Sequence, residues 1–184
     1  MNLRINSFLS LLFFMFFILT GCKTVENPPR TVEKVDIEKY AGTWYEIASF
    51  PAPFQEGCTC TTAEYISTDK GYLKVLNKCR KGSESDDIDK ATGKAFVVEG
   101  SGNAKLKVQF FWPFRADYWI LALANDYSYA AVGSPDREYL WILSRQPQID
   151  ESSRTRMEAQ LKEKGFDISR LENTPQNCWQ SGME

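Results

Sequence analysis

Cysteine is the residue type through which this chain could do covalent chemistry. The chain has five cysteines, Cys22, Cys58, Cys60, Cys79 and Cys178, and no histidine. A thiol nucleophile usually works beside an imidazole base, and most zinc and haem sites use histidine ligands. Cys58 and Cys60 are close in sequence, but no second close pair accompanies them, so the spacing does not indicate a metal or redox site. We therefore expect no metal, no cofactor and no enzymatic activity.

Cys22 has a different setting from the other four. Arg4 precedes an apolar run over residues 8–19, which has the length of a signal-peptide core and is too short to span a bilayer. The run ends in Leu-Thr-Gly-Cys at residues 19–22, which resembles the lipobox of bacterial lipoproteins, where cleavage before the cysteine accompanies attachment of lipid to its thiol. Acyl chains on Cys22 would anchor the chain to a membrane. We predict a signal peptide at residues 1–21, a tether at 22–34 and one folded domain at 35–184.

The elements that must position any site are short strands. From residue 40 onward, apolar and polar residues alternate, and Gly, Asp, Asn and Ser interrupt the alternation. The pattern predicts strands at residues 42–50, 61–68, 72–78, 93–98, 104–111, 118–124, 128–133 and 139–145. Eight consecutive strands favour an all-β, antiparallel up-and-down β-barrel. The polar stretch 80–90 is predicted to be a loop, and a helix of about 14 residues, starting near Asp150 and ending before Gly165, should pack outside the barrel.

Three sequence signatures carry a family resemblance. They are Gly-Thr-Trp-Tyr-Glu at 42–46, Asn-Asp-Tyr at 125–127 and Arg145 at the end of the last predicted strand. Their order and spacing resemble those of the lipocalins, and the run at 139–147 is very similar to that of the bacterial outer-membrane lipoprotein lipocalins, relatives of apolipoprotein D. The resemblance spans about residues 35–167 and implies a lipocalin barrel with an internal ligand site.

Gly42, Trp44 and Arg145 are expected to close one end of this barrel. Glycine permits a tight entry into the first strand, Trp44 can fill the end, and a guanidinium group at Arg145 can stack on the indole. We interpret these three residues as structural.

Alternation along the strands predicts the lining of the interior. If Trp44 and Arg145 point inward, so do Glu46, Ala48, Tyr139 and Trp141. The family resemblance implies the same orientation for Ala63, Tyr65, Val75, Asn77, Val108, Phe110 and Tyr118. These eleven residues are the predicted ligand-binding residues. The small side chains of Ala48 and Ala63 favour a void, and a barrel filled by its own side chains is the alternative.

The four cysteines after Cys22 form an even set in an exported chain, which indicates two disulfides. A hairpin centred on Lys70 brings both Cys58 and Cys60 within reach of Cys79, so local geometry does not choose among the pairings. The resemblance to apolipoprotein D favours a bond between Cys60 and Cys178, which leaves Cys58 for Cys79.

These observations predict a membrane-anchored lipocalin that binds and stores or transports a fatty acid or a lysophospholipid. The alternatives are a lipid-modifying enzyme that uses a cysteine thiol, and a structural envelope lipoprotein with a filled barrel. Lys23 after the lipidated cysteine resembles the outer-membrane sorting pattern, so we expect an anchor in the outer membrane, on its periplasmic face. The net charge of -2 without basic clusters argues against nucleic acid as a partner. A homodimer is left open.

Overall fold

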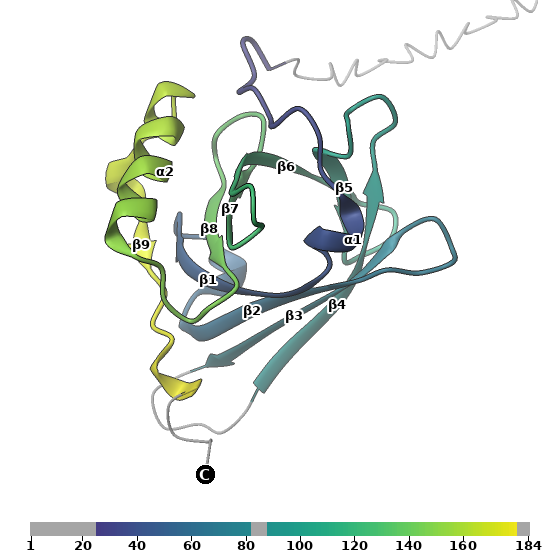
Figure 1. Cartoon of the computed structure of the whole chain (residues 1–184). Coiled ribbons are helices and arrows are strands. Elements are labelled where there is room, and N and C mark those ends of the chain that lie inside the picture. The colour runs from purple at the N-terminus through teal and green to yellow at the C-terminus, as the bar shows by residue number, and fades with distance from the viewer. Residues whose placement is uncertain (1–24, 82–87, 180–184) are drawn as a thin grey trace, which may run out of the picture.

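The computed structural model describes residues 25–81 and 88–179; the predicted signal peptide and lipidation site at Cys22 lie outside them. Eight strands follow one another around a barrel: β1 (Gly42–Ser49), β2 (Cys58–Ile66), β3 (Leu73–Lys81), β4 (Ile88–Val97), β5 (Lys105–Gln109), β6 (Ala116–Leu123), β7 (Tyr129–Gly133) and β8 (Leu140–Ser144). Each strand pairs antiparallel with the next, and β1 pairs with both β8 and β2, which closes the barrel (Figure 1). The predicted fold class is confirmed.

The predicted loop at 80–90 is wrong at both of its ends. Strand β3 continues to Lys81 and β4 starts at Ile88, with Arg80 paired to Ile88 and Cys79 paired to Asp89. Apart from Ile88 these ends are polar, and most of their residues are exposed. They therefore lack the apolar alternation that marks a buried strand, and only the pairing between the two strands reveals them.

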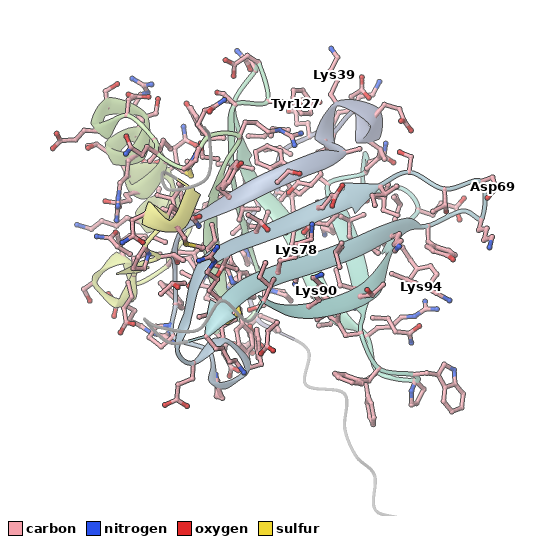
Figure 2. The ribbon with its side chains drawn as sticks, turned by 90° about the horizontal axis from the view of Figure 1, so that it is seen from below. Lys39, Asp69, Lys78, Lys90, Lys94 and Tyr127 are labelled. Atoms are coloured by element: carbon pink, nitrogen blue, oxygen red, sulfur yellow. A yellow bond between two sulfur atoms is a disulfide. The ribbon has the colours of Figure 1, made fainter. Side chains whose placement is uncertain are left out.

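One end of the barrel, here called the closed end, is covered by the short helix α1 (Ile37–Tyr40) (Figure 1). Asp36 starts the helix by accepting hydrogen bonds from the amides of Glu38 and Lys39. The other end, here called the mouth, carries the β1–β2, β5–β6 and β7–β8 connections. Lys39 and Tyr127 mark the closed end in Figure 2, and the β5–β6 loop extends from the mouth in the opposite direction.

Helix α2 (Glu151–Glu163) packs on the outside of the barrel, as predicted. The Asp150 side chain accepts a hydrogen bond from the amide of Ser153 and caps the helix. Met157 and Leu161 are buried against the outer faces of β1, β6, β7 and β8. No helix among the described residues is long and apolar enough to cross a membrane.

The C-terminal segment forms part of the barrel wall, which the sequence does not predict. Strand β9 (Glu172–Asn173) pairs with β1 where β2 has separated from it, with Asn173 opposite Ala48. Beyond it, the amide of Cys60 donates to the carbonyl of Pro175 at 2.8 Å. The tail therefore fills the gap between β1 and β2 in the half of the barrel that is nearer the mouth.

Candidate ligand-binding site inside the barrel

Trp44 and Arg145 form the floor of the barrel, as the sequence predicts. The Trp44 side chain is fully buried, and the Arg145 guanidinium carbon lies 3.7 Å from the centre of its ring. Arg145 also donates to the carbonyls of Lys39, Tyr40 and Ala41 at the end of α1, at 2.7–3.0 Å. Burial lowers the pKa of Arg145 from its ordinary value. The group stays charged because an arginine guanidinium is not deprotonated in proteins. One guanidinium thus joins β8, α1 and the indole at the closed end.

Gly42 is the position where this floor needs glycine. Its φ of +95° is a backbone conformation that other residues rarely adopt. A Cβ atom there would lie 3.3 Å from Nη1 of Arg145, which donates to the carbonyl of Thr43. The glycine therefore lets the chain turn into β1 directly beside the guanidinium.

Two buried tyrosines, Tyr40 and Tyr65, and the partly buried Tyr118 lie next to the floor. The hydroxyl groups of Tyr40 and Tyr118 are 2.7 Å apart, and the ring centres of Tyr65 and Tyr118 are 5.9 Å apart. Desolvation raises the pKa of all three phenols well above the ordinary value of 10. The lower part of the interior therefore contains neutral phenols, and those of Tyr40 and Tyr65 are shielded from water.

We expect Tyr40, Tyr65 and Tyr118 of the folded protein to stay protonated at a pH where the tyrosines of the unfolded chain ionise. The unfolded chain releases these protons near pH 10 and the folded chain keeps them, so the free energy of unfolding is fully retained below pH 10 and falls as the pH rises above it. Ultraviolet titration of phenolate checks this. Tyr118→Phe should reduce the alkaline loss of stability, and ionisation of all eight tyrosines together in the folded protein would contradict the assignment.

The walls above the floor bring together most of the predicted lining residues. One cluster inside the barrel contains Ala63, Tyr65, Val75, Val108, Phe110, Tyr118 and Trp141. Asn77 pairs with Ala63 and shares its face, and Glu46 pairs with Leu143, which belongs to the same cluster. Tyr139 stacks on Trp141 with ring centres 5.8 Å apart, which places it at the mouth.

The predicted inward orientation of Ala48 is wrong. The β1–β8 register shifts between Glu46 and Ala48, so a β-bulge adds one residue and reverses the alternation beyond it. Ala48 pairs with Ile142 and packs in the outer cluster with Met157 and Leu161 of α2. Ser49 therefore takes the inward position next to Trp141.

Glu46 is the centre of a polar network that sequence reasoning did not find. The residue is 5% exposed, and its carboxylate accepts hydrogen bonds from Ser49, from Gln55 at 2.7 Å and from Thr174 at 2.6 Å. Gln55 belongs to the short helix η1 (Pro53–Gln55) in the β1–β2 connection, and its side-chain oxygen accepts from the Trp141 indole at 2.8 Å. The network ties the mouth loop, β8 and the C-terminal tail to one buried carboxylate.

The tail contributes a second such link through Gln176. Its side-chain amide donates to the carbonyl of Glu46 on β1 at 2.7 Å and to that of Thr61 on β2 at 2.9 Å. The side chain thus bridges the two strands where they no longer pair. Thr174 and Gln176 are far from Glu46 in sequence, and the expected bond between Cys60 and Cys178 was the one signal that could have placed them there.

A family comparison agrees with this geometry. Residues 35–176 match the model of the lipocalin-like domain. The chain belongs to the lipocalin family. It is 41% identical to the outer membrane lipoprotein Blc of Escherichia coli (strain K12) over 160 residues, covering 84% of this chain and 88% of that protein. It is 37% identical to mouse apolipoprotein D over 161 residues, covering 82% of each chain.

A solved lipocalin structure shares the fold at much lower identity. Insecticyanin from the tobacco hornworm Manduca sexta superposes with a TM-score of 0.65 and 22% identity, covering 81% of this chain and 84% of that one. This likeness supports the barrel architecture alone.

The disulfides of this lipocalin pair Cys58 with Cys79 and Cys60 with Cys178. The first bond joins β2 to β3 near the mouth, and the second holds the C-terminal tail against β2. The four described cysteines are thus all in disulfides, so none of them offers a free thiol for the enzymatic alternative.

Non-reducing peptide mapping is expected to recover these two cross-linked peptides. The geometric reason is that the Cα atoms lie 5.4 Å apart in the first pair and 6.2 Å apart in the second, both within the range that a disulfide spans. A peptide joining Cys60 to Cys79 would overturn both assignments, because it takes one cysteine from each of the two assigned bonds.

Proposed function

We propose that this lipocalin is an outer-membrane lipoprotein that binds a fatty acid or a lysophospholipid inside the barrel and stores or carries it. The family relationship supports a hydrophobic ligand. The names of the Blc relatives, together with the Leu-Thr-Gly-Cys sequence at residues 19–22, support a lipid anchor in the outer membrane.

The observation that carries the proposal is the distribution of exposure along the interior. Near the floor, Trp44 and Ala95 are 0% exposed and Val75 is 1% exposed. Toward the mouth, Phe110 and Trp141 face the same interior but are only half-buried. An apolar interior that is sealed at one end and accessible from the other suits a ligand with an apolar tail and a polar head.

The polar groups of the lining bear on the choice of head group. The Glu46 carboxylate is a hydrogen-bond acceptor, and Oδ1 of Asn77 is a buried acceptor without a partner among the described residues. Acceptors favour a head that carries donors. The glycerol hydroxyl of a lysophospholipid is such a donor, whereas an ionised fatty-acid carboxylate is not, so this chemistry favours the lysophospholipid.

Mass spectrometry of lipids that copurify with the protein tests the function. We expect fatty acid or lysophospholipid to be enriched over the surrounding membrane, with lysophospholipid the more abundant of the two. A variant whose interior is blocked, Ala63→Trp, serves as the control and should copurify with membrane-average lipid. Equal lipid profiles for the two proteins would contradict binding inside the barrel.

The anchor has its own expected outcome. Replacing Cys22 with serine should release the protein from membranes or leave it unprocessed, because the thiol is the proposed site of lipid attachment. Fractionation after a carbonate wash measures this, with the unsubstituted protein as control. A Cys22→Ser variant that is processed and still sediments with membranes would contradict the lipoprotein assignment.

A further inference from the structure

The mouth of the barrel exposes an unusual amount of aromatic surface. In the β5–β6 loop, Phe111 is 80% exposed, Trp112 86% and Phe114 77%. Across the mouth, Phe54 of η1 is 63% exposed. A soluble surface rarely leaves large aromatic side chains this exposed unless they contact another molecule. These four residues are here called the aromatic rim.

The aromatic rim continues into the barrel along two walls. On one wall, Phe110 packs against the inner cluster and the chain leaves the barrel directly into Phe111. On the other wall, Trp141 stacks on Tyr139 at 5.8 Å, and Tyr139 lies 5.8 Å from Phe54. Aromatic surface therefore connects the interior with the outside, so the exposed rings and the ligand site belong to one continuous surface.

The N-terminal segment places the lipid anchor at the same end of the molecule. Arg137, in the β7–β8 connection at the mouth, donates to the carbonyl of Asn27 and to that of Lys164, each at 2.8 Å. Lys164 in turn donates to the carbonyl of Arg30 at 2.9 Å. These hydrogen bonds hold the segment from Asn27 to Arg30 beside the mouth.

The remaining length of chain limits how far the mouth can lie from the bilayer. Cys22 is five positions before Asn27, and an extended chain spans at most about 3.6 Å per residue, so the anchor lies within about 18 Å of this carbonyl. The closed end, with α1, Lys39 and Tyr127, points the opposite way (Figure 2). A bilayer that holds the acyl chains of Cys22 therefore lies on the side to which the β5–β6 loop extends.

We propose that the aromatic rim inserts into the interfacial layer of the bilayer that anchors the protein and holds the mouth of the barrel against it. Trp and Phe rings at the end of a loop suit this layer, because the apolar ring can be buried while the indole N–H and the backbone stay hydrated. Insertion and the lipid anchor act together, since one weak membrane attachment strengthens another. The inference rests on the proposed lipid anchor and names the bilayer as the place where a lipid enters the barrel.

Quenching of tryptophan fluorescence tests the insertion. The intact lipoprotein is reconstituted into phosphatidylcholine vesicles whose acyl chains are brominated either near the carbonyl end or near the methyl end. The fluorescence of Trp112 is taken as the difference between the protein and its Trp112→Phe variant. It should be at least twofold lower in brominated vesicles than in unbrominated ones, and lowest with bromine near the carbonyl end. Quenching that persists in Trp112→Phe reports brominated lipid close to the other tryptophans, such as Trp141, so ligand uptake and rim insertion are measured separately.

Two serine substitutions provide the matched control. Phe111→Ser with Phe114→Ser keeps Trp112 as the reporter and should reduce its quenching at least twofold. Ile66→Ser with Val97→Ser removes two partly exposed apolar side chains elsewhere on the barrel surface and should leave the quenching unchanged. Circular dichroism checks that both variants remain folded.

Two results would overturn the proposal. If Trp112 is insensitive to both brominated lipids but is quenched by aqueous acrylamide, the aromatic rim lies in water. If it is insensitive to both kinds of quencher, and sedimentation shows a dimer that Phe111→Ser with Phe114→Ser dissociates, the rim is covered by a second copy of the chain.

Discussion

Replacing Trp44 with alanine is expected to lower the free energy of unfolding by about 3–5 kcal/mol. The indole is fully buried, its N–H donates to the carbonyl of Tyr40 at 2.9 Å, and its ring stacks under the Arg145 guanidinium. Alanine would leave a cavity between these groups. It would also remove the stacking contact with the Arg145 guanidinium, which its hydrogen bonds to the end of α1 would still hold at the closed end. Chemical denaturation with the disulfides intact, followed by circular dichroism, measures the loss.

Trp112→Ala is the matched control, because it removes the same side chain from an 86% exposed position. Its free energy of unfolding should change by no more than about 0.5 kcal/mol. Equal stabilities for the two alanine variants would show that the closed end does not depend on Trp44.

Replacing Ala63 with tryptophan is expected to weaken binding of a fatty acid or lysophospholipid at least tenfold while the barrel stays folded. Ala63 pairs with Trp44 on β1 and with Asn77 on β3, faces the interior and is only half-buried. An indole there would occupy the space just above the floor that the acyl tail needs. Since each buried methylene contributes about 0.8 kcal/mol, losing a few of them is enough for the expected effect.

Glu64→Trp is the control for this variant, since it adds the same indole at the next position of β2, on the outer face. Glu64 pairs with Leu76 and forms a surface ion pair with Lys78, so its replacement should leave ligand affinity unchanged. Fluorescence displacement of a bound fatty-acid probe measures both affinities. If Ala63→Trp binds the probe as well as the unsubstituted protein, the ligand lies outside the barrel.

Local patterns in the sequence determined the barrel and its closed end. Alternating apolar residues define a strand wherever one face is buried, which is why the eight strands could be predicted. Apolar residues at helical spacing predicted the helix α2 in the same way. The floor could be predicted because Gly42, Trp44 and Arg145 lie in short signatures with recognisable spacing. The ends of β3 and β4 could not, because exposed polar strands carry no alternation.

The tertiary structure alone decided the finer geometry of the site. Apolar residues stand at both Ile47 and Ala48, so the sequence contains no mark of the bulge that turns Ala48 toward α2. The hydrogen bond between Thr174 and Glu46 joins residues 128 positions apart, and such contacts depend on how the whole chain closes. The exposure of Phe111, Trp112 and Phe114 likewise depends on where β5 ends, because an apolar run that continues beyond a strand looks the same in sequence whether it is buried or faces a membrane.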